Sequence, residues 1–108
     1  MSAYTHIADL VKAVELPSDG TLSRTIYQDD GLKAVLFGFI AGQELSEHTA
    51  SAPAIMHFLE GEVTVTLNDE SVTAKPGTWI HMPPQMRHSL RAKTPSKMLL
   101  LLLKGSAK

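Results

Sequence analysis

Residues 42–61 read GQELSEHTASAPAIMHFLEG, and residues 77–88 read GTWIHMPPQMRH. Each segment begins at a glycine and places a histidine, His48 or His88, beside a predicted β-strand. Two histidines that are far apart in sequence, each at the edge of a strand, can meet in one pocket of a small β-barrel. The two segments therefore predict both a fold and a candidate binding site.

The chain after about residue 22 shows the two-residue periodicity of β-strands. Residues 62–68 alternate polar and apolar side chains without exception, which indicates a strand with one buried face. Asp29, Asp30 and Gly31 form a turn signal between two such segments. Regular turns between many short strands predict an all-β fold, a double-stranded β-helix or jelly-roll barrel. We expect about eight strands, at residues 24–28, 32–40, 54–59, 62–68, 72–75, 78–82, 87–92 and 97–104.

The N-terminal segment departs from this pattern. Ile7, Leu10, Val11 and Val14 recur at helical spacing, which predicts a short helix at residues 7–14. A chain of 108 residues has room for one hydrophobic core. We therefore expect a single domain, with an N-terminal arm or short helix at residues 1–22 and a barrel at residues 23–108.

Composition argues against several classes of function. Ten Lys and Arg residues nearly balance 11 Asp and Glu residues, for a formal net charge of −1, and no basic stripe is present. Nucleic acid and anionic membranes are therefore not expected partners. The sequence has no cysteine, which excludes disulfides, thiolate metal sites and a thiol nucleophile. The longest apolar run is too short to cross a bilayer and no signal peptide is evident, so a cytoplasmic protein is expected.

That longest apolar run, residues 98–103, reads MLLLLL and is apolar on both faces of a predicted strand. An antiparallel strand with one face in water alternates instead, so the outer side of this strand needs a cover. At about 25 cal/mol per Å², the additional buried leucines contribute several kcal/mol. We expect a homodimer to provide the cover. Cover by residues 4–14 of the same chain is the open alternative.

The two histidine segments resemble the two motifs of the cupin superfamily, the small RmlC-like jelly rolls of the cupin type-2 conserved-barrel kind. The family's motifs are G-x5-H-x-H-x3,4-E-x6-G and G-x5-P-x-G-x2-H-x3-N. The second motif departs at Gln85 and Ala92, where glycine and asparagine are usual. The resemblance covers about residues 32–103 and implies the cupin fold but no particular activity, because the family hosts many. The residues in register are Gly42, His48, Gly61, Gly77, Pro83 and His88.

The resemblance implies a metal site that is mostly lost in this chain. The family's second histidine falls on Ala50 and its glutamate falls on Ala54. Of four expected ligands, only His48 and His88 remain. A catalytic zinc or non-haem iron site normally has three protein ligands, so two imidazoles would hold a divalent ion more weakly.

A third ligand would have to come from outside the motif positions. Glu44 shares strand parity with His48, whereas Glu47 is expected on the opposite face. Glu44, however, lies near a glycine in a predicted loop. His57 is the stronger candidate, because it lies in the strand that carries the lost glutamate position, but its parity is opposite and only a β-bulge near residues 54–55 would turn it inward. The alternative role for His57 is sheet packing or a subunit interface. The candidate metal ligands are therefore His48, His88 and, less strongly, His57.

An apolar lining is expected around the two motif histidines. Such a lining suits a small, partly hydrophobic molecule, although its methionines are equally explained as core packing. The orientation of His81 stays open. The expected lining residues are Met56, Phe58, Met82, Met86 and Leu90.

The sequence is consistent with two functions. It does not decide whether the chain catalyses a reaction. The first is a small cupin barrel that binds a small molecule, a divalent metal ion or both. The second is a metal-dependent enzyme of the dioxygenase, isomerase or decarboxylase type, with His48, His88 and an unusual third ligand. The expected cofactor is at most one divalent ion of zinc, nickel, iron or manganese, and the alternative is none. A metal-free epimerase with a histidine base and a tyrosine acid lacks support, because Tyr4 and Tyr27 lie outside both motifs.

Overall fold

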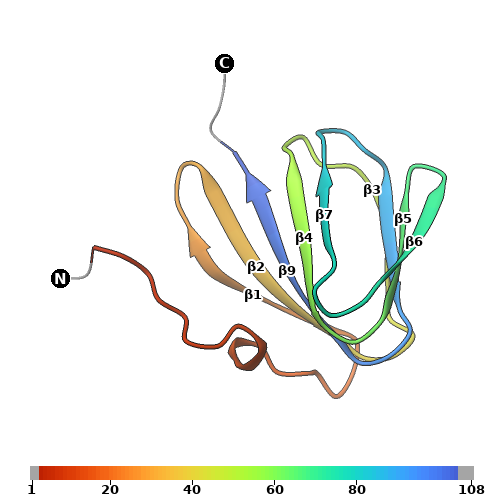
Figure 1. Ribbon diagram of the computed structural model, residues 1–108, viewed down its shortest axis with the longest axis horizontal. Coiled ribbons are helices and arrows are strands. Elements are labelled where there is room, and N and C mark those ends of the chain that lie inside the picture. Colours follow the sequence, from red (N-terminus) through yellow and green to blue (C-terminus); the bar gives the residue numbers. More distant parts are fainter. Residues whose placement is uncertain (1–2, 105–108) are drawn as a thin grey trace.

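The structure, a computed structural model, describes residues 3–104. Two antiparallel sheets face each other (Figure 1). One sheet has the strand order β1-β2-β9-β4-β7, and the other has the order β3-β8-β5-β6. This arrangement confirms the predicted all-β jelly-roll barrel. The strands are β1 Thr21–Gln28, β2 Leu32–Phe39, β3 Glu44–His48, β4 Ala54–Glu60, β5 Val63–Leu67, β6 Glu70–Ala74, β7 Trp79–Met82, β8 His88–Ala92 and β9 Ser96–Leu103.

The strands form where the sequence alternates, and the core lies between the two sheets. In β5, for example, Val63 and Val65 are fully buried while Thr64 and Thr66 are half-buried on the other face. The one strand that the pattern missed is β3, an edge strand with Leu45 as its single apolar residue. An edge strand with little buried surface carries little periodic signal, which explains the omission.

The predicted helix at residues 7–14 is wrong. Within the described residues, the only helix is a three-residue 3-10 turn, η1 Val11–Ala13. The Asp9 carboxylate accepts a hydrogen bond from the Val11 N–H at 3.1 Å, and Arg24 and Lys97 donate to the carbonyl groups of Ala13 and Val11. These side chains give the backbone partners other than helical ones, and a segment shorter than about 12 residues forms a stable helix poorly by itself.

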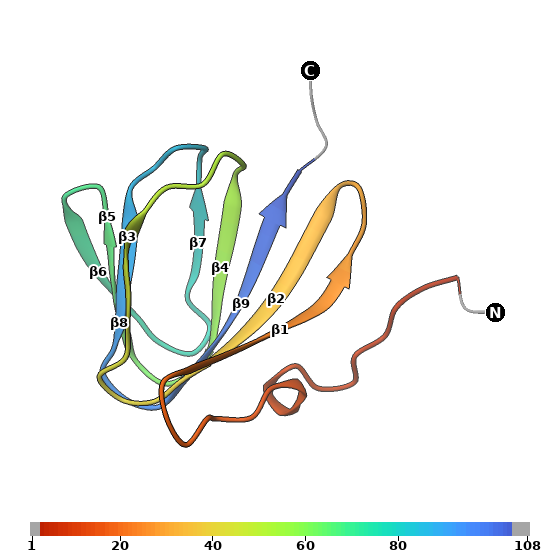
Figure 2. The same ribbon diagram turned by 180° about the vertical axis from the view of Figure 1, so that it is seen from behind.

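The N-terminal arm lies outside the barrel, beyond β1 (Figures 1 and 2). It packs on the outer face of the five-stranded sheet, where Val14 is buried in a small cluster with Leu36 and Leu99. Gly38 allows this close approach, since a Cβ there would lie 2.7 Å from the carbonyl oxygen of Glu15. The arm therefore supplies part of the cover that the apolar strand β9 needs. Between residues 3 and 104, no helix has the length and apolar character to span a membrane.

Asp29 closes the predicted turn between β1 and β2. Its Oδ1 accepts hydrogen bonds from the N–H groups of Gly31 and Leu32 at 2.8 and 2.9 Å, and its Oδ2 accepts one from the Tyr27 hydroxyl at 2.6 Å. The bond with Tyr27 lowers the pKa of Asp29 and raises the pKa of Tyr27. The hydroxyl group of Tyr27 is thereby hydrogen-bonded within a surface turn.

Candidate functional site

The structure brings His48 and His88 together. Their ring centroids are 4.2 Å apart and the ring planes are inclined by 61°. The two residues are register partners on the neighbouring strands β3 and β8. The histidines of the two motifs are therefore close neighbours, as the sequence predicts.

An irregularity in β3 decides which side chains accompany His48. Glu44 pairs with Arg91 and Leu45 with Leu90, but the register shifts before His48 is reached. The extra residue on β3 places His48 on the inner face with Leu45, not on the face of Glu44. The structure thus differs from the parity expected for Glu44, whose carboxylate instead pairs with Arg91 at 3.1 Å on the outer face.

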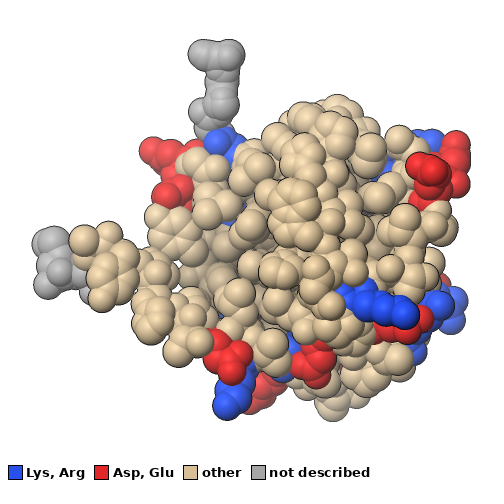
Figure 3. Space-filling view, viewed as in Figure 1, with Lys and Arg blue, Asp and Glu red and all other residues tan. Residues whose placement is uncertain are grey.

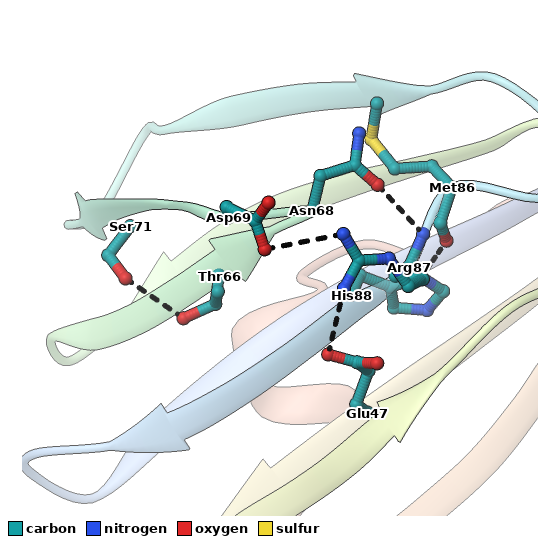
Figure 4. A network of polar contacts seen from close by, with 8 residues as sticks. All are labelled: Glu47, Thr66, Asn68, Asp69, Ser71, Met86, Arg87 and His88. Atoms are coloured by element: carbon teal, nitrogen blue, oxygen red, sulfur yellow. Dashed lines mark hydrogen bonds and ion pairs between the residues drawn. The ribbon is translucent and has the colours of Figure 1, made fainter.

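The outer neighbours of the two histidines tie β3 to the start of β8. Arg87 lies between Asp69 and Glu47, with N–O distances of 3.3 and 3.7 Å (Figure 4). The backbone N–H of Arg87 also donates to the side-chain oxygen of Asn68 at 3.3 Å. Exposed ion pairs typically contribute less than about 1 kcal/mol. The network therefore links β3, the turn between β5 and β6 and the residue before His88, with a small contribution to stability.

Both imidazole rings use the same nitrogen, Nδ1, in a hydrogen bond to a backbone carbonyl. The Nδ1 of His48 is 2.8 Å from the carbonyl oxygen of Ser46, and the Nδ1 of His88 is 3.0 Å from that of Met86, the latter drawn in Figure 4. A carbonyl oxygen only accepts, so each Nδ1 carries a proton, and in the neutral ring the lone pair is on Nε2. A backbone carbonyl that fixes the tautomer in this way is typical of histidines that bind a metal ion.

A cavity of about 70 Å³ lies beside the histidine pair. His48 is exposed and His88 is half-buried, so the site opens to solvent beside His48. The desolvation cost of an unpaired ring therefore concerns His88 more than His48. Apart from the two imidazoles and Ser89, the lining is apolar. The lining residues are Phe37, Leu45, His48, Met56, Met82, His88, Ser89, Leu90, Met98 and Leu100.

Three of the five expected lining residues contact the cavity, namely Met56, Met82 and Leu90. Phe58 is instead fully buried in the main core, and Met86 packs against that core from the segment before β8. Sequence reasoning missed Met98 and Leu100, which share a face of β9. The signal was masked because every residue from 98 to 103 is apolar, so that alternation does not reveal which face points inward.

His57 does not join the histidine pair. The inner face of β4 carries Met56 and Phe58, whereas His57 lies on the outer face as the register partner of Leu99. The bulge that would turn His57 inward is not formed near its start, since the register of β4 shifts only beyond Phe58. His81 is also exposed and outside the cavity lining. Both histidines thus belong to the outer surface of the five-stranded sheet.

The residues do not fit the divalent metal site that the motif resemblance implies. Ala54 is buried on the inner face of β4, opposite Met82, and offers only a methyl group where the motif has its glutamate. Ala50 likewise lacks a donor side chain. In the part of the chain that the structure describes, no group of three or more His, Cys, Asp or Glu side chains could hold a metal ion. The usual set of imidazole and carboxylate ligands is therefore missing.

Gln85 is another departure from the motif, and its backbone keeps the conformation for which glycine is usual. Its backbone is left-handed, with φ of 68°, at the position where glycine is usual. A residue with a side chain pays about 1–2 kcal/mol for this conformation. The Gln85 N–H donates to the carbonyl oxygen of Ala50 at 2.8 Å, which fixes the turn between β7 and β8. The strain therefore sits in the turn that leads to His88.

The remaining polar candidates lie elsewhere. Tyr4 is 77% exposed on the N-terminal arm, and Tyr27 is held in the β1–β2 turn. Neither lines the cavity, so the histidine and tyrosine arrangement of an epimerase is not formed. Arg24 is bound to the arm and Arg91 to Glu44, away from the cavity lining.

Comparisons with known proteins agree with this geometry. A family model described as a cupin domain matches residues 35–103. A conserved protein of unknown function from Streptococcus pyogenes is 30% identical, with a TM-score of 0.86 over 98% of this chain and 93% of that one. A cupin superfamily protein from Desulfitobacterium hafniense DCB-2 is 26% identical, with a TM-score of 0.83 over 88% and 87% of the two chains. An RmlC-like cupin protein from Desulfovibrio desulfuricans is also 26% identical, with a TM-score of 0.82 over 93% and 97%. A search of curated proteins finds no match.

Proposed function

This chain belongs to the cupin superfamily, and from that premise we propose that its barrel is a binding module whose histidine pair holds one metal ion or one very small polar molecule. The observation that carries the proposal is the pair of imidazole rings that line the cavity. The ring centroids of His48 and His88 are 4.2 Å apart, and both Nδ1 atoms are hydrogen-bonded to backbone carbonyls. In the neutral rings each Nε2 is then left with a lone pair that can bind a metal ion or accept a hydrogen bond.

The size of the cavity supports a very small occupant. The cavity measures about 70 Å³, whereas an engineered cavity that binds benzene measures about 150 Å³. Pockets for drug-sized molecules measure about 300–1,000 Å³. A larger, partly hydrophobic metabolite would therefore have to extend out of the cavity past His48, or the lining side chains would have to move. An ion or a molecule of a few heavy atoms requires no such change.

Binding is favoured over metal-dependent catalysis. A catalytic metal site usually combines three protein ligands with an open position. The described residues bring only two imidazoles together, and neither Glu44, Glu47 nor His57 lines the cavity.

A comparison of histidine variants tests the proposal. Untagged protein is titrated with zinc, nickel, manganese and copper ions and with small hydrogen-bond donors, and both the bound stoichiometry and the melting temperature are measured. We expect one equivalent to bind and to raise the melting temperature, because a ligand at 100 times its Kd stabilises the folded state by about 2.7 kcal/mol. His48→Gln and His88→Gln each lower the affinity at least about tenfold, since each removes one of two donors.

His57→Gln is the matched control, because it removes the same kind of side chain from the outer face of β4. We expect this variant to bind like the wild type. If the His48 and His88 variants also bind like the wild type, or if neither ions nor small donors bind the wild type, the proposal is wrong.

A further inference from the structure

We infer that the cavity is a site for a soft, singly charged metal ion, Cu(I), bound by His48 and His88 together with methionine thioethers from the facing sheet. The inference rests on the proposed role of the histidine pair. It goes further by specifying which kind of metal ion binds and which other side chains are ligands. It also starts from the misfit described above, because the cavity lacks the carboxylate and the third imidazole of the usual divalent site.

Three methionines of this chain line the same cavity. The sequence has five methionines, and Met56, Met82 and Met98 all line the cavity. They come from β4, β7 and β9 of the five-stranded sheet, and none is more than 2% exposed. His48 and His88 come from the four-stranded sheet. The cavity of about 70 Å³ thus has thioether side chains on one wall and imidazoles on the other.

One of these methionines stands beside the position of the lost glutamate. Ala54 is the register partner of Met82, and Met56 lies two residues further along the same face of β4. Position 54 therefore offers a methyl group in place of a carboxylate, and the two side chains beside it that line the cavity are thioethers. A hard, charged ligand is therefore replaced by soft, neutral ones.

The charge of the site also favours a monovalent ion. The lining residues include no carboxylate, and the sequence has no thiolate to offer. The cost of desolvating an ion grows with the square of its charge, so a dication costs about four times as much as a monocation of equal size. Thioether and imidazole donors without carboxylate are the set that Cu(I) prefers, whereas carboxylate and carbonyl oxygens suit manganese and other hard ions. Ligand type and charge therefore point to the same ion.

The test is a competition titration under anaerobic conditions. The untagged protein competes with a chromophoric Cu(I) chelator, and the titration is repeated with Ag(I), a redox-stable probe, and with zinc and nickel. The variants are Met56→Leu, Met82→Leu and Met98→Leu, singly and combined, and Met86→Leu is the control outside the cavity lining. Leucine has a similar volume to methionine, so each change costs less than about 1.5 kcal/mol of stability.

We expect one equivalent of Cu(I) or Ag(I) to bind. The affinity should fall at least about tenfold in the combined methionine variant, and Met86→Leu should leave it unchanged. Copper K-edge absorption should show sulfur scatterers in the wild type and fewer of them after each single substitution of a ligand. The single variants keep the test decisive if the combined variant does not fold.

The possible failures are distinguishable. Cu(I) binding that depends on His48 and His88 but not on any methionine overturns the inference and leaves the proposed function intact. The same holds if zinc or nickel binds more tightly than Cu(I). If no ion or small donor binds and the histidine variants match the wild type, the proposed function fails as well.

Discussion

Gly61 and Gly42 belong to the same motif but differ in the room available for a side chain. Both have a left-handed backbone, with φ of 84° and 86°. A Cβ at Gly61 would lie 2.3 Å from the carbonyl oxygen of Pro95 and 2.3 Å from the Oγ of Ser96. A Cβ at Gly42 would meet nothing within 4 Å. Backbone conformation alone explains Gly42, whereas close packing adds to the requirement at Gly61.

This difference gives a prediction for two single substitutions. We expect Gly61→Ala to lower the free energy of unfolding by about 2–5 kcal/mol, because left-handed strain of about 1–2 kcal/mol adds to overpacking of about 1–3 kcal/mol. Gly42→Ala should cost the strain alone. Urea unfolding of both variants measures the difference, and equal losses would contradict the packing argument.

At the scale of elements, the N-terminal arm and the strand β9 depend on each other. The arm has little regular structure, and its position is fixed by contacts with the sheet. The Lys97 side chain is 11% exposed and extends from β9 to donate a hydrogen bond to the Val11 carbonyl, with Glu60 at 3.9 Å. A hydrogen bond from a charged donor contributes about 1.5–3 kcal/mol. Lys97 is therefore a principal anchor of the arm.

We predict that Lys97→Met releases the arm while the barrel stays folded. Methionine keeps most of the side-chain volume and removes the donor. Hydrogen exchange at residues 11–15 should become faster, and limited proteolysis should cut there first. Lys93→Met is the control, because Lys93 is an exposed residue that pairs with Glu62 on the surface. Unchanged exchange at residues 11–15 in the Lys97 variant would show that apolar packing of the arm suffices.

At the scale of the whole molecule, the outer face of the five-stranded sheet is only partly covered. The arm buries Leu99, but Trp79 is 58% exposed, and His57 and Leu101 are half-buried on the same face. In the view of Figure 3, which takes in both sheets, the middle and upper part of the molecule shows few charged side chains, and most acidic and basic groups lie along the lower side and at the upper corners. With a net charge of −1, a second copy meets little electrostatic repulsion.

The homodimer therefore stays a prediction, with Trp79 near the centre of the expected contact. We expect sedimentation of the wild type to show a dimer, and Trp79→Asp to shift it to a monomer, because a charge placed in an apolar contact is costly to desolvate. Val72→Asp provides the control, since Val72 is an exposed apolar residue on β6 of the other sheet. A wild type that sediments as a monomer at all concentrations would show that the arm is the complete cover.

Local signals in the sequence were enough to predict most of the strands and turns of the architecture. The alternation in β5 and the turn at Asp29 reflect burial and backbone geometry over a few residues, and both appear in the structure where the pattern places them. The glycines and histidines of the two motifs were enough to predict that His48 and His88 meet. The predicted helix at residues 7–14 failed because contacts with distant Arg24 and Lys97 outweigh a weak local preference.

The sequence by itself determined the jelly roll, its turns and the pairing of two imidazoles, because strand periodicity and left-handed glycines act over short distances along the chain. Only the tertiary structure decided the face on which His48 lies, since the bulge in β3 exists only in its pairing with β8. The same holds for the three methionines that line the cavity beside the imidazoles. These features depend on how strands that are distant in sequence pair and pack against each other. A local pattern of residues does not specify such long-range contacts.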